Sequence, residues 1–194
     1  MASASARTAA LWLAAAAVLS GCAGPSVSGQ TGRTSPSSVA ATPATIHNAA
    51  DVTFAQHMIP HHQQAVDMAA MVPSHTANPT MGVIAIHIST DQRAEISTLE
   101  GFLNQWGASA TGPTMAMDGM VDPATMTELG SLTGPSFDRL WMDSMISHHR
   151  GALTMAADEL AHGKSPDALR MAQIIVNVQQ REISYLTDLV SAPE

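Results

Sequence analysis

The chain has 194 residues and a formal net charge of −8 with histidine neutral, and aromatic residues make up only 4% of it. The acidic balance argues against nucleic-acid binding, and the single cysteine excludes an intramolecular disulfide. Apolar content dominated by Ala, Leu, Ile and Met favours helices over sheet.

Residues 1–21 are expected to be a lipoprotein signal peptide. The apolar run LWLAAAAVLS after Arg7 is too short to span a bilayer as a stable helix. It ends in Leu-Ser-Gly-Cys, the pattern of a bacterial lipoprotein cleavage site, in which Cys22 becomes the lipidated first residue. Residues 22–46 are rich in Ser, Thr, Pro and Gly, which is typical of a flexible tether. We therefore expect a lipid anchor on the extracytoplasmic face of the cell membrane; a plain secretory signal with an incidental cysteine is the alternative.

Residues 47–191 are long enough for one domain, and this domain contains a repeat. The segment DVTFAQHMIPHHQQAVDMAA at 51–70 returns as DRLWMDSMISHHRGALTMAA at 138–157, a shift of 87 residues with nine of twenty positions identical. Because a single copy cannot bury its apolar faces alone, we expect the two copies to fold against each other.

Each copy predicts a hairpin of two helices. The candidate caps are Asn48 for the first helix and Ser136 for the third, while Asn78-Pro79, Asp122-Pro123 and Ser165-Pro166 each place a capping residue before a proline at the first helical position. We expect helices over 49–72, 80–106, 136–161 and 166–191, and a short extra helix over about 123–131. Repeats 49–106 and 136–191, joined by a Met-rich linker at 107–135, predict an all-α four-helix bundle with pseudo-twofold symmetry.

One stripe of each repeat's first helix is expected to face the core, with a histidine at its centre. Met58 and His61 lie one turn apart on this stripe, as do Met145 and His148 in the second copy. Two such pairs facing each other would supply two thioethers and two imidazoles, a set that suits Cu(I). The alternative is that the histidines are hydrogen-bonded core residues.

The flanking histidines, His62 and His149, lie about 100° around each helix and are expected to face an adjacent helix or a groove, where they could join a Cu(II) site. Duplicated polar residues on the second helix of each hairpin either orient the histidines as ligands or form a solvated face. These residues are Gln92, Glu95, Gln179 and Glu182.

The linker contains Met115, Met117 and Met120 on a polar, Gly-containing stretch. Such spacing is not that of core residues and predicts a second copper site, although methionines can also act as adaptable filler at the end of a bundle. His57 has no histidine counterpart in the other copy and is expected to be an incidental surface residue.

The segments MIPHHQQAVDMA and FDRLWMDSMISHHRGALTMA resemble the paired signatures of a CopM-like bacterial family, domain of unknown function 305, over residues 47–191. The resemblance implies a ferritin-like four-helix bundle in an exported protein. For the copper-binding members of the family it also implies copper ligation by Met and His, which here points to Met58, His61, His62, Met145, His148 and His149.

Three functions follow from these observations. The first is a membrane-tethered protein without catalytic activity that sequesters copper, with Cu(I) favoured over Cu(II), or passes it to a copper-transfer partner. The second is a ferritin-like di-metal oxidase, although Glu95 is followed three residues later by Thr98, and Glu182 by Tyr185, rather than by the histidine of the Glu-x-x-His motif of such centres. The third is a metal-free interaction module in which the histidines respond to pH.

Overall fold

The computed structural model of the chain describes residues 46–112 and 117–192. Five helices account for most of these residues, and none of the described residues forms a strand. The helices are α1 (Ala49–His75), α2 (Pro79–Trp106), α3 (Pro123–Ser131), α4 (Gly134–His162) and α5 (Pro166–Ser191). The predicted all-α four-helix bundle is confirmed, with α3 as the short extra helix in the linker.

Local capping explains why the helices begin where they do. The Asn48 side chain accepts hydrogen bonds from the backbone of α1, and Asp51 completes the capping box by accepting from the Asn48 N–H. The side chains of Asn78 and Ser165 each accept one hydrogen bond from a backbone N–H in the first turn of α2 and α5, and each helix has a proline in that turn. The prediction for Ser136 was wrong: α4 already begins at Gly134, because a proline in its first turn is preorganised for a helix.

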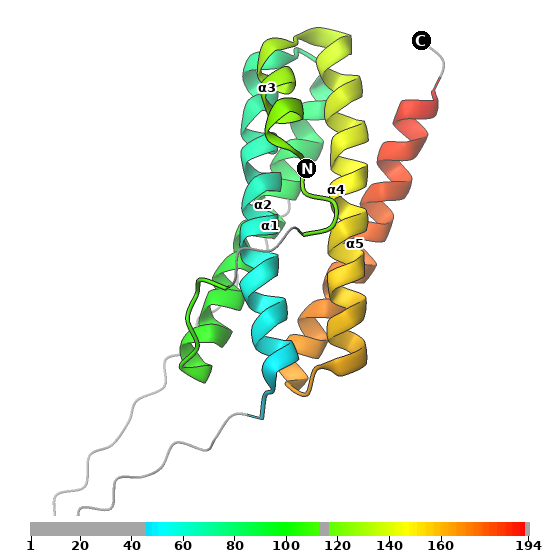
Figure 1. The fold of residues 1–194 in the computed structure, drawn as a ribbon. Helices are drawn as coiled ribbons and strands as arrows, with labels where there is room; N and C mark the ends of the chain where they lie inside the picture. The colour runs from blue at the N-terminus through cyan, green and yellow to red at the C-terminus, as the bar shows by residue number, and fades with distance from the viewer. Residues whose placement is uncertain (1–45, 113–116, 193–194) are drawn as a thin grey trace, which may run out of the picture. The chain divides into compact units, whose positions relative to one another are not determined.

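The bundle consists of two hairpins that meet through α1 and α4 (Figure 1). Helix α1 packs on α2, and α4 packs on α5, whereas α2 and α5 touch each other little. Helices α1 and α4 lie side by side and run in opposite directions, as the pseudo-twofold symmetry of the repeat requires (Figure 1).

Two aspartates of the repeat tie the hairpins together. Asp51 accepts hydrogen bonds from the backbone N–H groups of Lys164 and Ser165 in the α4–α5 loop, at 3.0 and 2.8 Å. Its counterpart Asp138 accepts from the side chain of Asn78 in the α1–α2 loop, at 3.1 Å. Each repeat thus holds the loop of the other, which fixes the register of α1 against α4.

The core divides into two apolar clusters along the bundle axis. One cluster surrounds Trp141 and lies in the half that α3 covers, and the other surrounds Phe54 and Leu99 in the opposite half. No helix within residues 46–112 and 117–192 has the length and hydropathy needed to cross a membrane. The predicted signal peptide, Cys22 and most of the predicted tether lie outside the described residues.

Candidate metal centre

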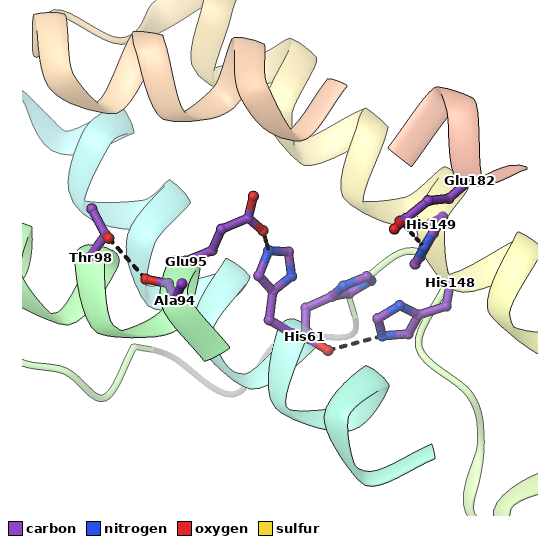
Figure 2. A network of polar contacts seen from close by, with 8 residues as sticks. His61, Ala94, Glu95, Thr98, His148, His149 and Glu182 are labelled. Atoms are coloured by element: carbon purple, nitrogen blue, oxygen red, sulfur yellow. Dashed lines mark hydrogen bonds and ion pairs between the residues drawn. The ribbon is translucent and has the colours of Figure 1, made fainter. Parts of the chain in front are cut away.

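A polar layer crosses the bundle between the two apolar clusters (Figure 2). All four helices of the bundle contribute to it, and its central histidines are fully buried. The layer contains His61 and His62 from α1, Gln92 and Glu95 from α2, His148 and His149 from α4, and Gln179 and Glu182 from α5. Eight polar residues that the repeat singled out therefore lie at one level of the fold.

The rings of His61 and His148 contact each other across the interface between the hairpins, with centroids 3.7 Å apart and ring planes tilted by 32°. His61 Nε2 lies 3.1 Å from the backbone oxygen of Asp118, and His148 Nε2 lies 2.9 Å from the backbone oxygen of His61. A carbonyl oxygen only accepts, so both Nε2 atoms must carry the proton and donate it. The remaining ring nitrogen, Nδ1, then has a free lone pair.

Burial keeps these two imidazoles neutral. Desolvation, followed by the nearby charge of His62, lowers the pKa of His61 from 6.5 to about 3. Desolvation also lowers the pKa of His148, and the proximity of His61 adds to the effect. Neutral imidazole is the form that binds a metal ion.

The flanking histidines are each held by a carboxylate from the second helix of their own hairpin. His62 Nε2 lies 2.7 Å from Glu95, and His149 Nε2 lies 2.8 Å from Glu182, as Figure 2 shows for the second pair. Both histidine side chains are fully buried, while the glutamate side chains are 12% and 21% exposed. The structure thus places both glutamates where they fix the orientation of an imidazole.

The Nδ1 atoms of all four histidines are buried and have no hydrogen-bond partner. Each Nε2 is engaged with an oxygen acceptor, so in the neutral form of each imidazole Nδ1 presents a bare lone pair. Buried polar atoms are rarely left without a partner, because an unmade hydrogen bond costs about 1–3 kcal/mol. Four such atoms lie in one layer, and each is a candidate ligand for a group that accepts lone pairs, such as a metal ion.

The two central methionines lie on opposite sides of the polar layer. Met58 belongs to the Phe54 cluster and Met145 to the Trp141 cluster, and both are fully buried. Each methionine lies three residues before its histidine, which is about 4.5 Å along the helix axis. Because α1 and α4 are antiparallel, these two offsets point in opposite directions, so the two methionines are separated by roughly 9 Å along the axis. The structure therefore does not bring both thioethers to one point.

The histidines form a row of neighbours. Ring centroids are 6.5 Å apart for His61 and His62, and 6.2 Å apart for His148 and His149. Within residues 46–112 and 117–192, no three His, Cys, Asp or Glu side chains gather closely enough to hold one ion.

The linker covers the central pair. Residues 117–121, which we call the strap, cross α1 and α4 at the polar layer (Figure 1). The amide of Gln64 binds both the N–H and the C=O of Val121 at 2.8 Å. At the matching position of α4, Gly151 lets the backbone of Asp118 approach the helix, where a Cβ would collide with it. The strap thus shields His61 from solvent.

Sequence reasoning did not identify the strap contacts. Two features of the sequence could have indicated them. Gly119 adopts a positive φ of 79°, and the repeat has Gln64 in its first copy where the second copy has Gly151. Of the linker methionines, Met117 and Met120 line two different cavities. Met115 lies outside the described residues.

The polar amides complete the layer. Gln92 and Gln179 are each only 2% exposed. Neither amide atom of Gln92 has a hydrogen-bond partner, and the same holds for the side-chain oxygen of Gln179. These groups face the interior, so the alternative of a solvated face does not apply to them.

Comparisons with known proteins agree with this fold. The family model described as Domain of unknown function (DUF305) matches residues 51–190. A DUF305 protein from Streptomyces coelicolor is 31% identical, with a TM-score of 0.69 over 72% of this chain and 89% of that chain. A DUF305 fragment from Deinococcus radiodurans is 30% identical, with a TM-score of 0.70 over 76% of this chain and 98% of that chain.

A further similar structure is CopM in the Cu(I)-bound form, which is 28% identical with a TM-score of 0.62 over 72% of this chain and 94% of that chain. CopM has also been solved in Cu(II)-bound, silver-bound and apo forms. None of the curated proteins matches the chain. The family predicted from the sequence signatures is confirmed, and the chain belongs to the DUF305 family.

Proposed function

We propose that this protein binds copper at the polar layer, outside the cytoplasm, and either sequesters the ion or passes it to a partner protein. The observation that supports this most directly is the set of four buried Nδ1 lone pairs without a partner. In our proposal, His61 and His148 bind the ion at the interface, and His62 and His149 extend the site on either side.

The ligand types favour copper over harder metals. Met58 and Met145 lie one turn before the central histidines, so each half of the site can add a soft thioether to the imidazoles. Imidazole and thioether suit Cu(I), and imidazole also binds Cu(II). The similarity to CopM, whose structures contain Cu(I), Cu(II) and silver, supports the same choice.

The carboxylates set the orientation of the flanking ligands. Glu95 and Glu182 accept the Nε2 protons, which fixes each imidazole with Nδ1 free. They come from different hairpins and stand at opposite ends of the histidine row. This arrangement gives each glutamate a histidine to orient, whereas a di-metal oxidase centre needs carboxylates that share the metal ions.

A histidine pH response at the central pair is not favoured, because the pKa of His61 is about 3 and that of His148 is also lowered. Neither imidazole would change its charge between pH 5 and 8. The export and anchoring part of the proposal rests on the N-terminal sequence, in which Cys22 would carry the lipid and residues 22–46 would hold the domain away from the membrane.

The test is a Cu(I) titration under reducing conditions against a chromogenic chelator. All samples carry Cys22→Ser, because a free thiol also binds Cu(I). We compare this parent chain, taken as the wild type, with the His61→Ala/His148→Ala double variant and expect the double variant to lose the tightest site, with an affinity weaker by roughly a hundredfold. The matched control is His75→Ala/His162→Ala, which removes two histidines at matching places of the helix ends and should bind as the wild type does.

Thermal unfolding of each variant shows whether the fold is retained. If the central double variant is folded and binds Cu(I) as tightly as the wild type, the site assignment is wrong. As a second variant that keeps the imidazoles, Glu95→Gln/Glu182→Gln should weaken binding about 10- to 100-fold, since partners of ligating histidines typically have that effect.

A further inference from the structure

The groove between α1 and α4 is covered in one half of the bundle and open in the other. In the covered half, α3 packs over it and buries Leu129 in the Trp141 cluster, while Met126 and Leu132 are partly buried against the same cluster. In the open half, the matching groove is a cavity of about 290 Å³. The strap, with Met117 and Asp118, borders this cavity at the polar layer.

The side chains along the open groove differ from those at the matching positions of the covered groove. Where the covered groove has Leu140 and Met71, which pack against the Trp141 cluster, the open groove has Thr53 and Asp158. His57 stands where the second copy has a buried serine. The open groove is therefore not an apolar surface that lacks its cover, because its polar side chains would not pack under a helix such as α3.

Three soft ligand groups line this one cavity: the imidazole of His57 on α1, the thioether of Met155 on α4, and the thioether of Met117 on the strap. All three residues are partly exposed, so an ion can reach them from solvent. The Nε2 atom of His57 is nevertheless buried and has no hydrogen-bond partner. The carboxylates of Asp118 and Asp158 line the same cavity and make it attractive to a cation.

We propose that His57, Met117 and Met155 form a second, solvent-accessible site for a soft monovalent ion, Cu(I) or its analogue Ag(I). Two thioethers and one imidazole from three separate segments can surround such an ion, and hard ions such as Mg²⁺ or Ca²⁺ would not compete for sulfur. The site shares no ligand with the buried histidine row. It therefore stands or falls independently of the copper site proposed at the polar layer.

The experiment is an Ag(I) titration of the full chain with ¹³C-labelled methionine methyl groups, followed by NMR. Every sample carries Cys22→Ser, because the only thiol of the chain would otherwise compete for the ion. We expect the methyl signals of Met117 and Met155 to shift together, and the Met117→Leu/Met155→Leu variant to bind one ion fewer. Leucine conserves the side-chain volume, so the variant should keep its fold.

The control is Met120→Leu, which removes a methionine of the same strap that lines a different cavity, and which should bind the full number of ions. The site should also persist in the His61→Ala/His148→Ala background. Full stoichiometry in the Met117→Leu/Met155→Leu variant, or an equal loss in Met120→Leu, would overturn the proposal.

Discussion

Acidification of the metal-free protein should destabilise it through the two central histidines. Their imidazoles are neutral in the folded bundle but take up protons once unfolded. The unfolded state then binds more protons than the folded state at any pH below the ordinary histidine pKa of 6.5. Neither imidazole destabilises the fold above pH 6.5, and the destabilisation grows as the pH falls from 6.5 toward the lowered pKa of the folded state, which is about 3 for His61.

The magnitude follows from the linkage relation. When the pH falls from 7 to 5, each imidazole that stays neutral in the folded state lowers the free energy of unfolding by about 2 kcal/mol. His61 and His148 together therefore lower it by about 4 kcal/mol. Glu159 acts in the opposite direction, because burial and its neighbour Asp51 raise its pKa from 4.5 to about 8. A carboxyl group with a raised pKa stabilises the folded state at low pH. The free energy of unfolding therefore gains roughly 2.5 kcal/mol from Glu159 when the pH falls from 7 to 5.

Urea unfolding of chelator-treated protein at pH 7 and pH 5 measures the sum of these effects. The wild type should lose only about 1–2 kcal/mol on acidification, because the two terms oppose each other. The Glu159→Gln variant, which mimics the protonated side chain, should lose about 4 kcal/mol. A loss below about 1 kcal/mol in that variant would refute the argument that His61 and His148 are buried in the neutral form.

Other parts of the structure give further expectations. Glu182→Gln alone should weaken Cu(I) binding about tenfold and Glu95→Gln should do the same, and an effect at only one of them would contradict the twofold equivalence of the site. Gly151→Ala places a methyl group against the backbone oxygen of Asp118 and should destabilise the protein by about 1–3 kcal/mol in urea unfolding; an unchanged midpoint would show that the strap does not lie there. Trp141→Phe removes a 2.9 Å hydrogen bond to a backbone carbonyl of α1 and should cost about 1 kcal/mol, whereas a neutral result would argue against that bond.

The helices were predictable because their signals are local. Asparagine or serine before proline is a local signal for a helix start, and such pairs placed the starts of α2 and α5 within one residue. The repeat predicted the four-helix bundle, since two matching hairpins have few ways to bury their apolar stripes other than by packing against each other. Ser136 failed because an earlier proline competes for the same start, and position alone does not decide between two candidates.

The assembly of the polar layer depends on the register of the helices against one another, which cannot be read from the sequence pattern. Glu95 and Glu182 each meet a histidine 33 residues earlier, a distance set by the length of the hairpin loops and by the way the helices pack. Their duplicated pattern was visible, but whether they faced a histidine or solvent was not. The offset of Met58 from Met145 likewise follows from the antiparallel crossing of α1 and α4 rather than from either motif.

The strap contacts depend on the tertiary path of the linker. Asp118 accepts the Nε2 proton of His61 across 57 residues of sequence, and no spacing rule relates the two. Gln64 and Gly151 occupy equivalent positions and support the strap in different ways, one by hydrogen bonds and the other by leaving room. A symmetric repeat could not predict this asymmetry.

The proposed copper site is tested most directly by ¹⁵N NMR of histidine-labelled protein during addition of Cu(I). In the metal-free state, His61 and His148 should show a protonated Nε2 and an unprotonated Nδ1. One equivalent of Cu(I) should shift the Nδ1 signals of both residues and leave their Nε2 protons in place. Nδ1 signals that stay unchanged while the ion binds elsewhere would contradict the proposal that the buried lone pairs of the polar layer hold copper.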